Sequence, residues 1–336
     1  MSTYPLGKLP ADDLARLLSS YAPHDPRVLV GGGIGADAAV IDMGDRYLVA
    51  KTDPITFATD KVGWYAVNVN ANDIACTGAT PRWFLATVLL PENKTIPALV
   101  DDIFAQLSAA CSELAISLVG GHTEITYGLD RPLVIGQMLG EVAPDNLITT
   151  QGAQVGDELL LTKGIAIEAT AIIASERQSQ LKDILDESEL DRYANFLYNP
   201  GISVVKDAAV AIAVGGVHAL HDPTEGGVAT GLHELAEAAG VGLEIFEDRL
   251  PYLPETTRLC QHFGLDPLGL IASGALLIAA EPGASANIVA ALAQAGIEAS
   301  LIGRVQPAEK GRVLLGEAGP RPLPQFKRDE IARLFE

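Results

Sequence analysis

The stretch that decides the fold spans residues 51–79 and reads KTDPITFATDKVGWYAVNVNANDIACTGA. Its middle part, residues 60–75, has the apolar spacing of a helix, and the residues before it end a strand. On a helical wheel at about 100° per residue, several apolar side chains share one side with Asn70 and Asp73. An amide and a carboxylate on a packed helix face cost stability unless a partner satisfies them. Asp73 is therefore either a structural cap for a neighbouring loop or part of a binding site.

The composition places the chain among ordinary α/β proteins. Its 336 residues are 48% hydrophobic and 20% charged, and aromatic residues make up only 5%. This length suggests two domains, which we place at residues 1–150 and 151–336. No apolar run reaches the roughly 18–20 residues that cross a membrane, and no basic segment followed by an apolar one marks a signal peptide. Three widely spaced cysteines fit a reducing compartment, so we expect a cytoplasmic protein with no membrane partner.

The formal net charge of −20 restricts the partners that this chain can bind. Nucleic acid would be repelled over most of the surface, and no cluster of Lys and Arg offsets the repulsion, so we expect no nucleic-acid partner. A phosphorylated ligand would need a metal cation to mediate much of the contact. The acidity could equally serve solubility alone.

Acidic residues follow two segments near the N-terminus. Residues 28–41 read VLVGGGIGADAAVI, a glycine-rich loop that leads into a strand, with Asp37 at the junction. The loop lacks the Gly-Lys-Ser/Thr of a Walker A motif, and the strand after it argues against a dinucleotide fingerprint. A second strand, residues 47–50, leads to Asp53, and acids at strand ends are placed to reach a cleft. Glycine clusters also make simple turns, so the loop alone does not establish a site.

Residues 221–232 read HDPTEGGVATGL and predict the start of another helix. Asp222 would be the N-cap and Pro223 the first helical residue, with an acid in capping-box register. Gly226 and Gly227 in the first turn are poor helix formers. They either let an anionic ligand approach the free N–H groups of the helix or permit tight packing of the helix on a sheet.

Taken together, six short motifs resemble the aminoimidazole ribonucleotide (AIR) synthase superfamily, the PurM-like proteins. They occur in the family's order at residues 35–40, 52–53, 66–81, 120–123, 156–157 and 222–230. The likeness is greatest to the HypE-like branch of hydrogenase maturation, through residues 222–230 and 264–268. It implies a mixed α/β (α+β) fold, in which a β-rich N-terminal domain pairs with a second copy in a homodimer and an α/β domain follows.

The resemblance also implies the cofactors ATP and Mg²⁺, bound between the two domains. The implied metal ligands are Asp37, Asp53 and Asp73, of which Asp53 and Asp73 would be catalytic. The nucleotide site would further include Gly35, Asn72, Gly120, Gly121, His122, Thr123, Asp222, Gly226 and Gly227. Asn70 is then expected to be structural, because the family pattern points to Asn72. The implied reaction phosphorylates an oxygen on a small-molecule or protein-borne acceptor, whose identity stays open.

The sequence departs from each branch of this superfamily. HypE carries its carbamoyl group on a C-terminal cysteine, whereas this sequence ends RLFE and its last cysteine is Cys260. His122 stands where the family commonly has an acid, although the selenide dikinase branch has His there. Two alternatives therefore stay open: a catalytically silent ATP-binding partner in a maturation complex, and a kinase of the thiamine-monophosphate kinase or selenide dikinase type. A dinucleotide-dependent enzyme that uses residues 31–35 is a third.

Overall fold

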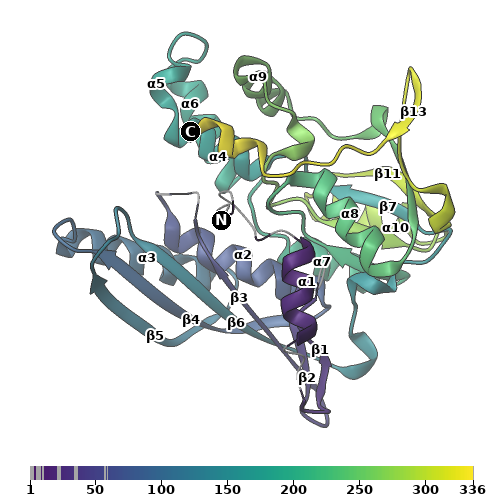
Figure 1. The fold of residues 1–336 in the computed structure, drawn as a ribbon, viewed down its shortest axis with the longest axis horizontal. Helices are drawn as coiled ribbons and strands as arrows, with labels where there is room; N and C mark the ends of the chain where they lie inside the picture. The colour runs from purple at the N-terminus through teal and green to yellow at the C-terminus, as the bar shows by residue number, and fades with distance from the viewer. Residues whose placement is uncertain are drawn as a thin grey trace.

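The computed structural model describes Tyr4, Leu9 and residues 11–20, 24–33, 37–56, 58 and 60–335. These residues form two units, each a β-sheet with helices packed on it, as Figure 1 shows. The predicted mixed α/β architecture is confirmed. Gly35, predicted to bind nucleotide, lies outside the described residues. None of the described helices is long and apolar enough to cross a membrane.

The first sheet is built by residues 28–142. Its described strands lie side by side in the order β1 (Val28–Val30), β2 (Ala39–Asp42), β3 (Tyr47–Pro54), β6 (Leu133–Val142), β4 (Thr80–Pro91) and β5 (Ser117–Thr126). The register aligns Asp53 of β3 with Gly136 of β6. Ala86 of β4 lies beside Gly136, and Gly121 of β5 lies beside Ala86. Because neighbouring strands are about 4.8 Å apart, this row places Gly121 about 14 Å from Asp53.

Helices cover one face of the first sheet. They are α2 (Val62–Cys76) and α3 (Pro97–Glu113), and α1 (Ala11–Ser20) lies before β1. The helix predicted at residues 60–75 is confirmed as α2, but its expected single packed face is wrong, because every residue of α2 except Trp64 is buried. The sheet packs against one side of α2, and α3 and the second unit pack against the others (Figure 1). Helix α2 is thus the centre of the molecule.

The second sheet is built by residues 158–322. Its described strands lie in the order β13 (Gly319–Pro322), β12 (Arg312–Gly316), β9 (Gly242–Phe246), β11 (Ala299–Gln306), β7 (Glu158–Thr162), β10 (Leu277–Ala280) and β8 (Val217–His221). The β9–β12 pair is parallel, and the other neighbouring pairs are antiparallel. The helices of this unit are α4 (Ile167–Glu176), α5 (Gln178–Leu181), α6 (Glu187–Ala194), α7 (Val205–Val214), α8 (Gly227–Ala239), α9 (Pro254–Phe263) and α10 (Ser285–Gln294).

Buried residues alternate between the two faces of the second sheet, as the strand period requires. Leu159 and Leu161 of β7 belong to the larger hydrophobic core, which continues through α4 and α8 and into the first unit. Leu160 belongs to a second core, formed with α7 and α10. The predicted domain division at residues 150/151 falls in the connector between the two sheets and stays a prediction.

The other face of the first sheet carries no helix among the described residues (Figure 1). Leu85, Leu89, Ile135 and Leu139 point to this open face, because their sequence neighbours point to the helices. These four side chains are half-buried. Strand β5 forms the edge of the sheet, and all of its residues except the last are exposed. The first unit therefore presents an apolar sheet face and an unpaired strand edge to the outside.

Candidate functional site

Two of the predicted acids meet at a lysine. Lys51 lies two residues before Asp53 on β3, so both side chains leave the same face of the strand. Asp73 projects from the last turn of α2. The Nζ atom of Lys51 is 3.2 Å from Asp53 Oδ2 and 3.3 Å from Asp73 Oδ1. The lysine thereby bridges β3 and α2.

Asn70 holds these two elements in position. Its Oδ1 accepts a hydrogen bond from the Asp53 N–H at 2.8 Å, and its Nδ2 donates to the Ala66 carbonyl in its own helix. Gly136 on β6 leaves the necessary space, because a Cβ there would lie 2.3 Å from Asn70 Nδ2. The amide is fully used in joining α2 to the sheet. The prediction that Asn70 is structural is confirmed.

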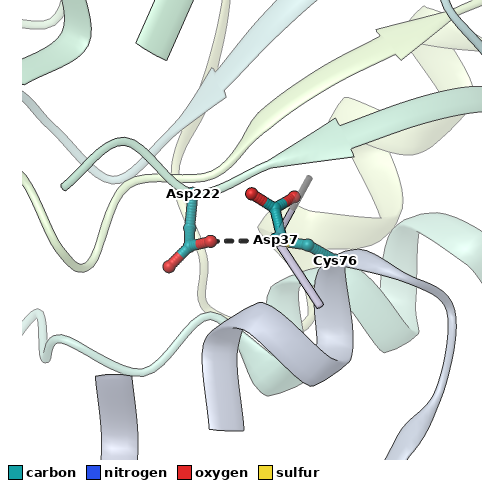
Figure 2. A group of neighbouring side chains, drawn as sticks. All are labelled: Asp37, Cys76 and Asp222. Carbon is teal, nitrogen blue, oxygen red and sulfur yellow. Dashed lines mark hydrogen bonds between the residues drawn. The ribbon is translucent and has the colours of Figure 1, made fainter. Parts of the chain in front are cut away.

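A second group of side chains comes together beside the first. Asp37 follows the glycine-rich loop, Cys76 ends α2 and Asp222 follows β8; Figure 2 shows the three gathered at one place. One potential ligand atom from each lies within 4.8 Å of the other two. The Sγ–H of Cys76 donates to Asp222 Oδ1 at 3.4 Å. The structure thus adds a thiol to carboxylates that the sequence already suggested.

His221 fixes the orientation of the Asp37 carboxylate. Its Nδ1 is 2.8 Å from Asp37 Oδ1, and its Nε2 is 3.1 Å from Glu234 Oε2. Burial opposes the charge of the imidazole, but the two carboxylates raise the pKa of His221 well above its ordinary value. The protonated ring therefore donates to both acids. The Thr150 hydroxyl donates to the second oxygen of Asp37 at 3.1 Å.

The acids around Lys51 form one electrostatic unit. We call Asp37, Asp53, Asp73 and Asp222 the acid cluster. Burial alone would lower the pKa of Lys51, but the acid cluster raises it well above its ordinary value, so the ammonium stays charged. Burial also raises the pKa values of Asp73 and Asp222. One oxygen of each, Asp73 Oδ2 and Asp222 Oδ2, is buried without a hydrogen-bond partner. The cluster is therefore short of positive charge and of hydrogen-bond donors.

This donor set fits a divalent cation. Carboxylate oxygens are the ligands that Mg²⁺ prefers, and a cation bound at either unpaired oxygen would satisfy it. A cavity of about 30 Å³ lies beside Asp37 and Cys76, enough for one water molecule. Burial raises the pKa of Cys76 well above its ordinary value, so its thiol is protonated. Among these groups the carboxylate oxygens, and not the protonated thiol, have the chemistry that suits Mg²⁺.

Asn72, predicted to lie in the nucleotide site, joins the two units, and its contact with a nucleotide stays a prediction. Its Nδ2 donates to the Ile202 carbonyl and its Oδ1 accepts from the Val204 N–H, both at 2.8 Å. The side chain is fully buried. These bonds join α2 to the segment before α7, so the amide connects the two units.

The predicted start of α8 is corrected. The helix has Gly226 as its N-cap in the left-handed region at φ 80°, so Asp222 is not the cap. A Cβ on Gly227 would lie 2.4 Å from the Leu268 carbonyl oxygen, so tight packing is the interpretation that holds for this glycine. The Gly226 N–H donates to Asp329 Oδ2 at 2.7 Å. The Asp329 carboxylate therefore accepts the hydrogen bond of an N–H group that was predicted to bind a phosphate.

Residues 120–123 lie apart from the acid cluster within one chain. They belong to β5, about 14 Å across the sheet from Asp53 by the register of the strands. The His122 side chain is exposed, with Nε2 3.3 Å from Glu124 Oε2. A Cβ on Gly121 would lie 1.9 Å from the backbone oxygen of β4 beside it, so this glycine permits the strand pairing.

Lys51, Cys76 and His221 are the residues of this region that the sequence-based prediction missed. Each lies at a spacing that brings it to a predicted acid. Lys51 precedes Asp53 by one strand period, and Cys76 follows Asp73 by about one helical turn. His221 ends β8 directly before the acid-bearing loop. The spacing alone could have suggested the first two.

Comparison with known families matches both units. The model of the AIR synthase related protein N-terminal domain matches residues 35–142, and that of the C-terminal domain matches residues 154–316. A hydrogenase expression/formation protein of Methanocaldococcus jannaschii is 27% identical over 320 residues, 91% of each chain. The carbamoyl dehydratase HypE of Escherichia coli is 31% identical over 279 residues, 80% of this chain and 78% of the relative.

Solved structures show the same fold. The structure of E. coli HypE has a TM-score of 0.73 at 26% identity and covers 96% of this chain and 98% of its own. HypE in complex with ATP has a TM-score of 0.72 at 23% identity, with 94% and 95% covered. AaThiL complexed with AMPPCP and TMP has a TM-score of 0.70 at 20% identity, with 88% and 91% covered. This chain, with its PurM-like fold, therefore belongs to the AIR synthase related protein family.

Proposed function

We propose that this chain is an ATP- and Mg²⁺-dependent enzyme that transfers a phosphoryl group to an oxygen of a small-molecule or protein-borne acceptor. The observation that carries the proposal is the acid cluster, in which Asp73 and Asp222 each keep a buried carboxylate oxygen without a partner. The family of this chain supports the proposal, since one solved HypE is a complex with ATP and AaThiL is a complex with AMPPCP and TMP.

In this proposal Asp37, Asp53 and Asp73 hold Mg²⁺, and Asp222 adds a fourth carboxylate. Bound magnesium would bridge the triphosphate and neutralise part of its charge. Such neutralisation is needed because the chain carries a net charge of −20 and would repel a bare polyanion. The task of the chain itself is positioning: Asn70 locks β3 to α2 and so keeps Asp53 and Asp73 at a constant separation.

We also propose that two copies pair through the open face and edge of the first sheet. This surface carries half-buried leucines and isoleucines on β4 and β6 and the exposed strand β5. A second copy would cover the apolar face and satisfy the strand edge. Residues 120–123 lie far from the acid cluster of their own chain. In this proposal they therefore contribute to the nucleotide site of the other copy.

Calorimetric titration with ATP, with and without Mg²⁺, tests the metal–nucleotide site. Asp53→Asn and Asp73→Asn should each abolish the Mg²⁺-dependent binding of ATP, because each removes a charged ligand from the cluster. Asp130→Asn is the matched control, since Asp130 is an exposed acid that pairs with the surface residue Lys94. Binding that survives in both cluster variants would overturn the assignment.

The acceptor separates this proposal from its alternatives. ATP turnover with a small molecule from a metabolite panel would favour a kinase. Tight ATP binding without turnover, together with a co-purifying partner protein, would favour the catalytically silent alternative. The dinucleotide alternative has no support, because the glycine-rich loop is followed by β2 and not by the helix that such a loop requires.

A further inference from the structure

Lys51 supplies the acid cluster with a cation of its own. Its Nζ atom lies between Asp53 Oδ2 and Asp73 Oδ1, at 3.2 and 3.3 Å, and its side chain is only 21% exposed. In the part of the chain that the structure describes, no other lysine or arginine forms an ion pair with either acid. The ammonium thus stands where two carboxylates from different elements converge.

A divalent ion that bridged these two acids would need the same place. Mg²⁺ and Mn²⁺ bind carboxylate oxygens at about 2.0–2.2 Å, so an ion shared by Asp53 and Asp73 would sit between their oxygens, where Nζ now lies. The ammonium and the ion also repel each other strongly in this buried setting. The two cations therefore exclude each other at this position.

Lys51 can nevertheless vacate the position. Its side chain is a flexible four-carbon stem, and its partial exposure leaves a route toward solvent. Asp73 Oδ2 and Asp222 Oδ2 are buried without a hydrogen-bond partner while Lys51 is in place, so each of these acids keeps an oxygen available to a metal ion. On Asp73 the lysine is paired with Oδ1, and the available oxygen is Oδ2.

We infer that Lys51 is a resident cation that competes with divalent metal for Asp53 and Asp73, so that metal alone binds this chain weakly and the lysine limits how many ions the cluster holds. The inference rests on the proposed function in placing divalent ions at these acids. It concerns metal without nucleotide, however, so it can be tested separately from ATP binding.

The experiment is a titration of the full chain with Mn²⁺ alone, in which electron paramagnetic resonance reports the free ion. Lys51→Met should bind Mn²⁺ roughly tenfold or more tightly than the wild type, because the competing charge is gone. Lys51→Arg keeps the cation and should bind like the wild type. Lys94→Met is the matched control, because it removes the same charge from an exposed site and should leave Mn²⁺ binding unchanged.

Equal Mn²⁺ affinities for Lys51→Met and Lys94→Met would overturn the inference. So would a loss of ATP affinity in Lys51→Met at unchanged Mn²⁺ affinity, which would make the lysine a phosphate contact. Thermal unfolding followed by circular dichroism verifies that each variant folds, and Lys51→Gln replaces Lys51→Met if the latter does not. Failure of the wild type to bind ATP with Mg²⁺ would overturn the proposed function and leave this comparison intact.

Discussion

Glu168 is a buried acid outside the acid cluster whose surroundings tie stability to pH. It lies in the first turn of α4, it is 5% exposed, and its Oε2 has no hydrogen-bond partner. Burial raises the pKa of Glu168 to about 7, from an ordinary value of 4.5, while Ser273 works in the opposite direction. The folded chain therefore binds this proton more tightly than the unfolded chain does.

The raised pKa of Glu168 predicts a loss of stability with rising pH. Glu168 contributes most to the free energy of unfolding below its pKa in the unfolded chain. This contribution is lost as the pH rises through its pKa in the folded chain, which lowers the free energy of unfolding by roughly 3 kcal/mol in total. Glu168→Gln should remove this dependence, so its free energy of unfolding in urea should vary less than that of the wild type between about pH 5 and pH 8. Glu309→Gln, at an exposed position, should keep the wild-type slope. An unchanged slope in Glu168→Gln would contradict the prediction.

Three polar residues of α2 show what a sequence pattern leaves undetermined. Asn70, Asn72 and Asp73 stand within four positions of one helix; the helical pattern marks Asn70 and Asp73 as unusual for a packed face, and the family resemblance adds Asn72. Their partners differ completely: the sheet backbone for Asn70, the second unit for Asn72 and Lys51 for Asp73. Asn70 and Asp73 lie on the side of α2 that meets β3, whereas Asn72 faces the second unit. A wheel diagram gives the direction of a side chain but not what lies there.

At the scale of elements, α8 shows how tertiary contacts override a capping signal. Asp222 and Pro223 have the spacing of a helix start, yet the helix begins four to five residues later, at Gly226 and Gly227. Asp222 instead bonds Cys76, and Asp329 accepts the N–H of Gly226. A distant carboxylate thus takes the capping role that the local sequence offered to a nearer one.

The two terminal glycines of α8 predict different costs of substitution. Both have positive φ, 69° at Gly227 and 66° at Gly240, so an alanine at either is strained by about 1–2 kcal/mol. A Cβ at Gly240 meets nothing within 4 Å, whereas one at Gly227 would lie 2.4 and 2.6 Å from the backbone oxygens of Leu268 and Leu270. Gly227→Ala should therefore lower the free energy of unfolding by about 2–5 kcal/mol, and Gly240→Ala only by the backbone strain.

Denaturant unfolding of the two variants decides this point. Equal losses for Gly227→Ala and Gly240→Ala would show that the contact between the α8 N-terminus and residues 268–270 is loose. A larger loss at Gly227 would confirm that this glycine serves packing. In either case the comparison holds backbone strain constant, because both sites adopt the same left-handed conformation.

At the scale of the whole molecule, the first sheet is covered on one face only. Its other face carries half-buried apolar side chains and the β5 edge is exposed, and we expect a second copy to cover them. Leu89→Lys, at a half-buried β4 side chain on the open face, should weaken this pairing, because it would place a charge in the interface. Sedimentation velocity should then show a species of 35.2 kDa in place of a dimer.

Met43→Lys is the control for this prediction. Met43 is 55% exposed and follows β2, near the other end of the sheet from β5. It should leave the sedimentation of the chain unchanged. A wild type that sediments as a monomer, or a Leu89→Lys variant that remains a dimer, would contradict the proposed pairing.

Much of the fold follows from the sequence, because it depends on local periodicity. Apolar residues at strand and helix spacing predicted α2 and several strands, and short motifs in order indicated the family. The resemblance to the family marked Asp37, Asp53 and Asp73, which lie at loop, strand and helix ends, as candidate ligands. Each of these inferences needs only neighbours in the chain.

The arrangement of the site depended on the tertiary structure. Lys51 meets Asp73 across two elements, and Asp222 reaches Cys76 from 146 positions away, so neither contact has a local signal. The same holds for Asn72, whose amide bonds the backbone of the second unit. Periodicity determines which face of an element a side chain leaves, and therefore the sequence alone determined the elements and the acids. Only the packing of β3, α2 and β8 against one another decided which charges meet, because electrostatic and hydrogen-bond energies depend on distances through space.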